Sequence, residues 1–213
     1  MENNKNYLDD LTEIRSIMER SSRFLSLSGY SGIFAGIFGI LGGLVAYWYF
    51  YHSEFLLGGE VPHLTGQLAD KIKWFLIMDG GIVLFLALIS AIFFSWVEAK
   101  KRGVALWDST TKRVLINLSI PLVSGGIFII VLIYYSLLYF LVPVSLLFYG
   151  LGLLNAGNYT LSEVRYLGMA EIAAGILALF FMKYGIYFWI LGFGIFHIIY
   201  GVVMYFKYDK NQD

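Results

Sequence analysis

The sequence predicts an all-α integral membrane protein, a six-transmembrane-helix bundle with a short amphipathic N-terminal cytoplasmic helix. The first observation is composition: of 213 residues, 59% are hydrophobic and 14% are charged, against about 45–50% and about 25% in soluble domains. The second is length, because six apolar stretches each approach or exceed the roughly 20 residues that cross a bilayer. The third is continuity, since the strands of a membrane barrel would alternate apolar and polar residues.

The six stretches define the domain organisation. Residues 1–26 form a cytoplasmic segment, residues 27–206 form the membrane domain, and residues 207–213 form a cytoplasmic tail. The expected spans cover about residues 27–51, 72–97, 114–136, 138–156, 164–184 and 186–206. Between the third and fourth spans, residues 134–143 carry no charge and include three tyrosines. We expect a tight aromatic turn there, with a re-entrant segment as the alternative.

Residues 7–25, ahead of the first span, have the pattern of an amphipathic helix. Leu11, Ile14 and Met18 recur at helical spacing, and acidic residues come early and basic residues late, which suits the helix dipole. This helix either lies on the membrane surface or docks a cytoplasmic partner. We favour the membrane surface, because that position requires only an apolar face.

The distribution of basic residues predicts the orientation. With the N-terminus in the cytoplasm, twelve of the 15 lysines and arginines fall on the cytoplasmic side, and only Lys71, Lys73 and Lys183 fall on the other. Positive charge concentrates on cytoplasmic loops. Both termini are therefore expected in the cytoplasm, as an even number of spans requires.

Composition and motifs exclude several kinds of site. The chain has no cysteine, which removes disulfides and thiolate-bound metals, and its net charge of zero offers no case for nucleic acid as a partner. No metalloprotease, nucleophile-elbow or phosphate-loop motif is present. We therefore expect no cofactor and no catalytic residue. We also expect no metal site, because no helical register holds together the loop residues with suitable ligands, His52, Glu54, Glu60 and His63.

Glycine forms the informative pattern within the spans. Small residues allow helix backbones to approach closely in lipid, where no hydrophobic force draws helices together. In the first span they recur at steps of three and four, and two later spans repeat part of the spacing. We expect the first span at the centre of the bundle or at a homodimer interface. The glycines expected at helix contacts are Gly29, Gly32, Gly36, Gly39, Gly43, Gly168, Gly175, Gly194 and Gly201.

Glu171 and His197 interrupt these glycine patterns. Glu171 stands between Gly168 and Gly175, and His197 between Gly194 and Gly201, so both should face other helices. They lie about 10 Å and about 13 Å from the cytoplasmic ends of their spans at 1.5 Å per residue. Their spans are joined by a very short connection and must be neighbours. Because an unpaired charge at this depth costs at least about 3 kcal/mol, we expect the two side chains to pair.

Three further polar residues lie within the spans. Asp79 lies about 10 Å in from the outer face, in a different layer from Glu171 and His197. Asn117 and Asn155 lie near the cytoplasmic ends of the third and fourth spans. Pro121 has no N–H to donate to the Asn117 carbonyl, so we expect a kink beside Asn117.

Two functions are compatible with these residues. Asp79, Glu171 and His197 can form a proton or cation relay, because ionisable groups inside a membrane commonly mark proton or ion pathways. Alternatively, Glu171 and His197 are a polar pair that holds two helices together. We favour the second, because no row of polar residues joins the two layers. The expected function is a non-enzymatic membrane protein, structural, regulatory or partner-binding; the alternative is a small proton- or cation-coupled transporter of unknown substrate. The expected partners are the lipid bilayer and a second copy or another membrane protein.

The beginning of the chain resembles a known group. The run from Leu11 to Phe24, LTEIRSIMERSSRF, leads into Leu27-Ser28-Gly29-Tyr30-Ser31-Gly32. This region resembles the start of a group of uncharacterised multi-pass inner-membrane proteins from bacteria. The resemblance implies a bacterial inner (plasma) membrane location and no particular activity.

Overall fold

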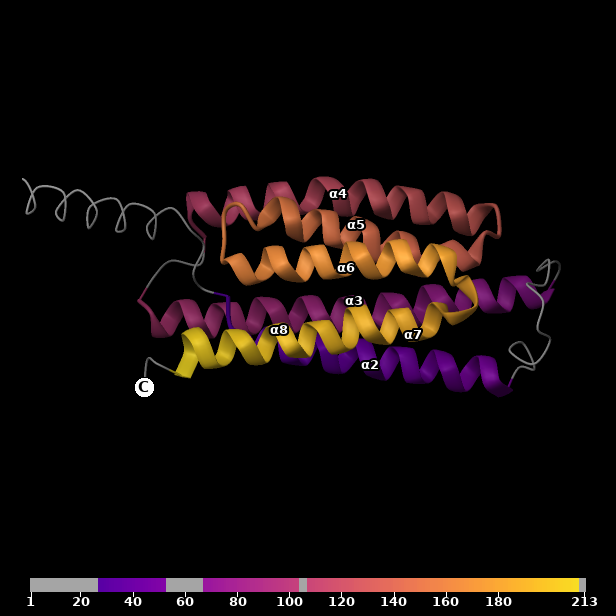
Figure 1. Ribbon diagram of the computed structural model, residues 1–213, viewed down its shortest axis with the longest axis horizontal. Helices are drawn as coiled ribbons and strands as arrows, with labels where there is room; N and C mark the ends of the chain where they lie inside the picture. Colours follow the sequence, from indigo (N-terminus) through magenta and orange to yellow (C-terminus); the bar gives the residue numbers. More distant parts are fainter. Residues whose placement is uncertain (1–26, 53–66, 104–106, 211–213) are drawn as a thin grey trace, which may run out of the picture.

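The protein is an elongated helical bundle. The computed structural model describes residues 27–52, 67–103 and 107–210, and every regular element in these ranges is helical. The long helices lie roughly parallel to one axis, and the chain reverses direction from each to the next (Figure 1). The predicted all-α class is therefore confirmed. The predicted amphipathic helix at residues 7–25 lies outside the described residues.

The helices follow the predicted spans closely. The final span is not one uniform helix, because the π-helix η3 separates α7 from α8 and a second short π-helix, η4, follows α8. The elements are α2 (Gly29–His52), α3 (Gln67–Lys101), α4 (Ser109–Tyr134), η1 (Leu138–Phe140), α5 (Leu141–Ala156), α6 (Ser162–Phe180), η2 (Met182–Tyr184), α7 (Gly185–Trp189), η3 (Ile190–Phe196), α8 (His197–Met204) and η4 (Tyr205–Asp209).

Five helical segments of the described chain are long and apolar enough to cross a membrane: Gly29–His52, Asp70–Lys101, Ser109–Tyr134, Leu138–Ala156 and Met182–Asp209. These segments fit a membrane location. The predicted span 164–184 corresponds to α6, which ends at Phe180 and has 19 residues. α6 is not one of the five. It carries Glu163, Arg165 and Glu171, a high charge content for a membrane helix.

The bundle consists of two halves. In one half α5 packs on both α4 and α6; in the other α2 packs on α3, η3 and α8. Figure 1 shows α4, α5 and α6 side by side above the other helices. The halves meet where α6 contacts α7, η3 and α8 and where α5 contacts α7. We call this contact the central interface.

The two ends of the bundle have different chemistry. At the end where α2 begins, Asp209 accepts hydrogen bonds from the Gly29 backbone N–H at 2.9 Å and the Ser28 hydroxyl at 3.2 Å; we call this the Asp209 end. At the opposite end Phe50 and Ile72 belong to a buried apolar cluster, and Lys183 lines a pocket beside them. We call this the Lys183 end.

Both ends of α4 are built by local hydrogen bonds. At its start Asp108 accepts from the backbone N–H of Thr111 at 2.6 Å and from its hydroxyl at 2.7 Å, an N-cap. Partial burial raises the pKa of Asp108, but these hydrogen bonds outweigh it, so the pKa lies below the usual range. At its end Ser136 adopts a φ of 60°, and the Leu137 N–H donates to the Leu132 carbonyl at 2.8 Å. The connection to α5 is thus a tight turn closed by a Schellman motif.

Candidate functional site

Glu171 of α6 and His197 of α8 lie together in the central interface. Glu171 Oε1 is 3.3 Å from His197 Nδ1. Glu171 is 0% exposed and His197 is 6% exposed. α6 presents Glu171 on the face that also buries Gly168 and Gly175, as the glycine spacing indicates. The structure therefore places the two predicted ionisable residues at the same site.

Both ring nitrogens of His197 have a polar neighbour. Nδ1 lies 3.0 Å from the Gly192 carbonyl oxygen, and Nε2 lies 2.8 Å from the Tyr149 hydroxyl of α5. A carbonyl oxygen only accepts, so Nδ1 carries a hydrogen. When the ring is neutral, Tyr149 donates to Nε2; when the ring is charged, Nε2 donates to Tyr149. The Tyr149 ring also stacks on His197, with centroids 5.4 Å apart.

The π-helix η3 shapes this site through Gly192, which contacts both His197 and Glu171. A π-turn shifts the backbone hydrogen-bonding pattern by one residue and often occurs at functional sites. Here the Gly192 carbonyl of η3 is available to the imidazole of His197, five residues later. Gly192 must also be small, because a Cβ there would lie 2.5 Å from Glu171 Oε2 and would overlap the Leu146 side chain. Because residue 192 has no side chain, the backbone of η3 packs directly against the Glu171 carboxyl group.

Glu171 is under-satisfied. Both of its carboxylate oxygens are buried, and neither has a hydrogen-bond partner among the described residues, since the Nδ1 hydrogen of His197 points to Gly192. A buried carboxylate without donors is costly. The two groups therefore lie side by side without a hydrogen bond between them.

The structure keeps Asp79 apart from this cluster. Asp79 lies on the face of α3 that packs on α2, where a Cβ on Gly42 would lie 3.6 Å from its carboxylate. Glu171, His197 and Tyr149 belong to the central interface instead. The three ionisable residues predicted for a relay therefore do not form one site.

Asn117 and Asn155 form a separate polar contact between α4 and α5. Asn155 Nδ2 donates to the Asn117 carbonyl oxygen at 3.0 Å, while Asn117 Nδ2 donates to the Arg113 carbonyl at 2.8 Å. Pro121 lies within α4, so the Asn117 carbonyl has no helical donor. The amide of Asn155 supplies that hydrogen bond from the neighbouring helix.

The glycines of the first span line its contact with the last. A Cβ on Gly29, Gly36 or Gly39 would lie closer than 3.0 Å to backbone atoms of Tyr205, Gly194 or Phe193 respectively. The remaining predicted glycines also lie at helix contacts, and those of α6 face α5. Their nearest neighbours are Gly201 and Tyr200 for Gly32, Ile190 for Gly43, Gly150 for Gly168, Leu147 and Pro143 for Gly175, Ile40 for Gly194, and Gly29 and Ile33 for Gly201.

Sequence reasoning missed Tyr149 and Gly192. Tyr149 lies within the fourth predicted span, and neither its spacing nor a charge distinguishes it from the other aromatic residues of the chain. Gly192 precedes Gly194 by two residues and so falls outside the three-and-four spacing. Its proximity to Glu171 depends on the π-turn.

Loop residues with metal-ligand side chains do not gather in the described part of the chain. Among the described residues there is no group of three or more His, Cys, Asp or Glu that could hold a metal ion. His52 Nδ1 lies 2.9 Å from the Trp48 carbonyl oxygen. Glu54, Glu60 and His63 lie outside the described residues.

A second polar contact joins the two halves at the Asp209 end, beyond the contacts of α6 with α8. Glu163 of α6 accepts a short hydrogen bond from Lys207 of η4 and also accepts from the Tyr208 hydroxyl at 3.2 Å. The Lys207 side chain is 56% exposed, so this pair contributes little to stability. It links η4 to the start of α6.

Comparison of the chain with protein-family models, curated proteins and solved structures found no match.

Proposed function

We propose that the chain is a six-span bacterial inner-membrane protein, with both termini cytoplasmic, whose function is structural, regulatory or partner-binding rather than enzymatic. One observation carries this proposal: both nitrogens of His197 are engaged, by Gly192 and Tyr149, beside a Glu171 that is 0% exposed. A catalytic acid or base must reach its substrate. These side chains instead face one another across three helices.

The Glu171–His197–Tyr149 cluster is best suited to holding the two halves of the bundle in register. It joins α5 and α6 of one half to η3 and α8 of the other. Polar contacts between membrane helices are typically worth about 0.6 kcal/mol and reach about 1.7 kcal/mol. Their directionality also specifies which helix faces meet.

A small proton-coupled transporter is the second candidate. Two observations favour it: neither Glu171 oxygen has a hydrogen bond among the described residues, and the neighbouring helix contains a π-turn, a feature common at functional sites. In this role Glu171 would take up and release the transported proton.

Glu171→Gln separates the two candidates. A structural role predicts a lower unfolding temperature for this variant in detergent and no pH-driven proton flux by the unaltered protein in liposomes. The matched control is Asp79→Asn, which neutralises a carboxylate outside the cluster and should leave the unfolding temperature closer to that of the unaltered protein.

The opposite result would favour the transporter: the unaltered protein would show a pH-driven proton flux, and Glu171→Gln would abolish this flux without changing the unfolding temperature.

A further inference from the structure

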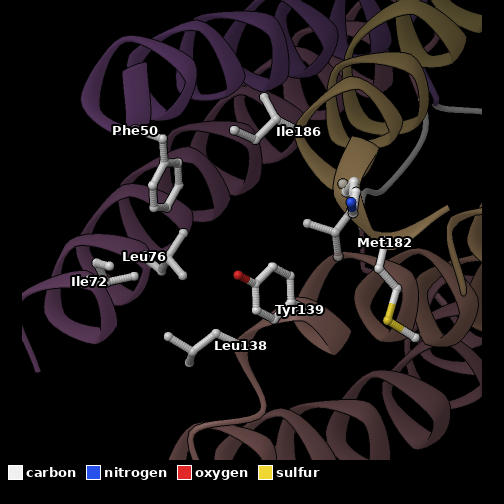
Figure 2. Close-up of a pocket in the computed structure, with 10 residues that line it drawn as sticks. Phe50, Ile72, Leu76, Leu138, Tyr139, Met182 and Ile186 are labelled. Atoms are coloured by element: carbon white, nitrogen blue, oxygen red, sulfur yellow. The ribbon is translucent and has the colours of Figure 1, made fainter. Parts of the chain in front are cut away.

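A pocket of about 110 Å³ opens at the Lys183 end of the bundle. It lies between the two halves: Phe50 of α2 and Leu76 of α3 form one side, and Leu138, Val142 and Met182 form the other. Figure 2 shows these elements surrounding the space, with the Phe50 and Met182 side chains on opposite sides. The pocket therefore lies at the mouth of the central interface.

The walls are apolar and two of the lining residues carry polar groups. The polar lining side chains are Tyr139 of η1 and Lys183 of η2. In Figure 2 the Tyr139 hydroxyl points into the space between Leu76 and Ile186. Lys183 is exposed, so it lies at the rim. A ligand for this pocket would have an apolar part and a group that accepts hydrogen bonds and carries negative charge.

The level of the pocket is that of the lipid headgroups. Tyr51 at the end of α2 is 55% exposed, and Tyr184 and Tyr187, which follow Lys183, are 56% and 57% exposed. Exposed aromatic residues at the ends of membrane helices mark the interface between hydrocarbon and headgroups. Lipid is the most concentrated amphipathic molecule at that level.

The size of the pocket selects the same class of ligand. Sites that enclose a small molecule usually have volumes of about 300–1,000 Å³, whereas this pocket has about 110 Å³. It therefore accommodates only part of a ligand, and the remainder must lie outside. A phospholipid meets this condition, because part of one acyl chain can enter while the rest stays in the bilayer.

We propose that this pocket binds an anionic phospholipid of the surrounding membrane, with a segment of acyl chain between Phe50, Leu76 and Ile186 and the phosphate at Lys183 and the Tyr139 hydroxyl. The other lysines described at this end, Lys71 and Lys73, do not line the pocket. The proposal does not depend on the role of Glu171.

Native mass spectrometry of the full chain in detergent tests the proposal, with phosphatidylglycerol and phosphatidylcholine of identical acyl chains as probes. The unaltered protein should retain phosphatidylglycerol in preference. Lys183→Gln should lower this retention about fivefold, the effect of one lysine at an anionic surface. Leu76→Trp, which fills the pocket, should lower the retention of both lipids.

The control is Lys73→Gln, which removes a charge from the same end but not from the pocket and should leave retention unchanged. Equal losses in Lys73→Gln and Lys183→Gln would show that lipid is held by surface charge alone and would overturn the proposal. Unchanged retention in Leu76→Trp, or no preference between the two lipids, would overturn it as well. If Leu76→Trp does not fold, Val142→Phe, which narrows the pocket from the opposite wall, provides the same test.

Discussion

Asn155 and Pro121 lie on different helices but act on the same carbonyl group. Pro121 removes the N–H that would bond the Asn117 carbonyl within α4, and Asn155 donates to that carbonyl from α5 at 3.0 Å. An unpaired carbonyl is especially costly in hydrocarbon, where no water is available. The two residues therefore compensate one another, and their substitutions should not be additive.

Asn155→Leu should lower the free energy of unfolding by about 1 kcal/mol, the size of a hydrogen bond between membrane helices. Adding Pro121→Ala should recover much of this loss, because residue 121 then supplies the main-chain donor. Thermal unfolding in detergent, followed by tryptophan fluorescence, measures both variants. Asn117→Leu is the control, since it keeps the carbonyl. Equal effects of Asn155→Leu with and without Pro121→Ala would contradict this account.

The residues of the candidate site differ in how far the sequence predicts them. Glu171 and His197 can be placed face to face because helical spacing from neighbouring glycines and depth along each span both follow from the 3.6-residue period. Tyr149 and Gly192 cannot be placed in this way. Their contacts depend on which face α5 turns to α8 and on a π-turn, both of which arise from packing between distant segments.

At the level of elements, α2 uses glycine on two faces. Gly36 and Gly39 face the backbone of η3 and α8, whereas Gly42 faces Val83 and Asp79 of α3. Removing side chains on both faces lets α2 contact two helices closely, which suits its place in the middle of its half. Residue spacing predicts the first face. It does not identify Gly42, which lies beside Gly43 in sequence but packs on another helix.

Gly39→Ala should destabilise the protein by about 1–3 kcal/mol, the usual cost of overpacking. A Cβ on Gly39 would lie closer than 3.0 Å to the backbone carbonyl group of Phe193, and backbone atoms cannot rotate away as a flexible side chain can. Gly126→Ala on α4 is the matched control, because a Cβ there meets nothing within 4 Å. It should be neutral or stabilising by up to about 1 kcal/mol, given the helix propensity of alanine. Similar losses in both variants would argue against close packing at Gly39.

Helix boundaries are predicted well where local turn residues determine them and poorly where hydropathy is the only signal. The predicted ends of the fourth span, residues 138–156, agree with η1 and α5 because a tight turn and Gly157 delimit them. The fifth predicted span extends beyond the observed end of α6 at Phe180. There Phe181 leaves helical geometry with a φ of −124° and a ψ of 48° although it belongs to a continuous apolar run. Hydropathy alone does not mark such a break.

For the whole molecule, the two halves meet through three kinds of contact along the bundle. At the Asp209 end Glu163 accepts from Lys207 and Tyr208. In the middle Glu171 lies beside His197, and at the Lys183 end the halves diverge around a pocket. The contacts within each half are more extensive than those between the halves. Relative motion of the halves would therefore cost less than rearrangement within either half, and lipid at the pocket would bias it.

The six-span arrangement can be tested with single cysteines, because the chain has none of its own. Asn158 lies exposed between α5 and α6, and Tyr184, beyond the far end of α6, is 56% exposed. If α6 crosses the membrane, Asn158→Cys and Tyr184→Cys must react with an impermeant maleimide from opposite sides. Lys101→Cys and Tyr51→Cys serve as references for the two sides of the membrane. The maleimide should label Asn158→Cys from the same side as Lys101→Cys, and Tyr184→Cys from the same side as Tyr51→Cys. Reaction of Asn158→Cys and Tyr184→Cys from one side would mean that α6 does not cross, and Glu171 would then lie outside the hydrocarbon.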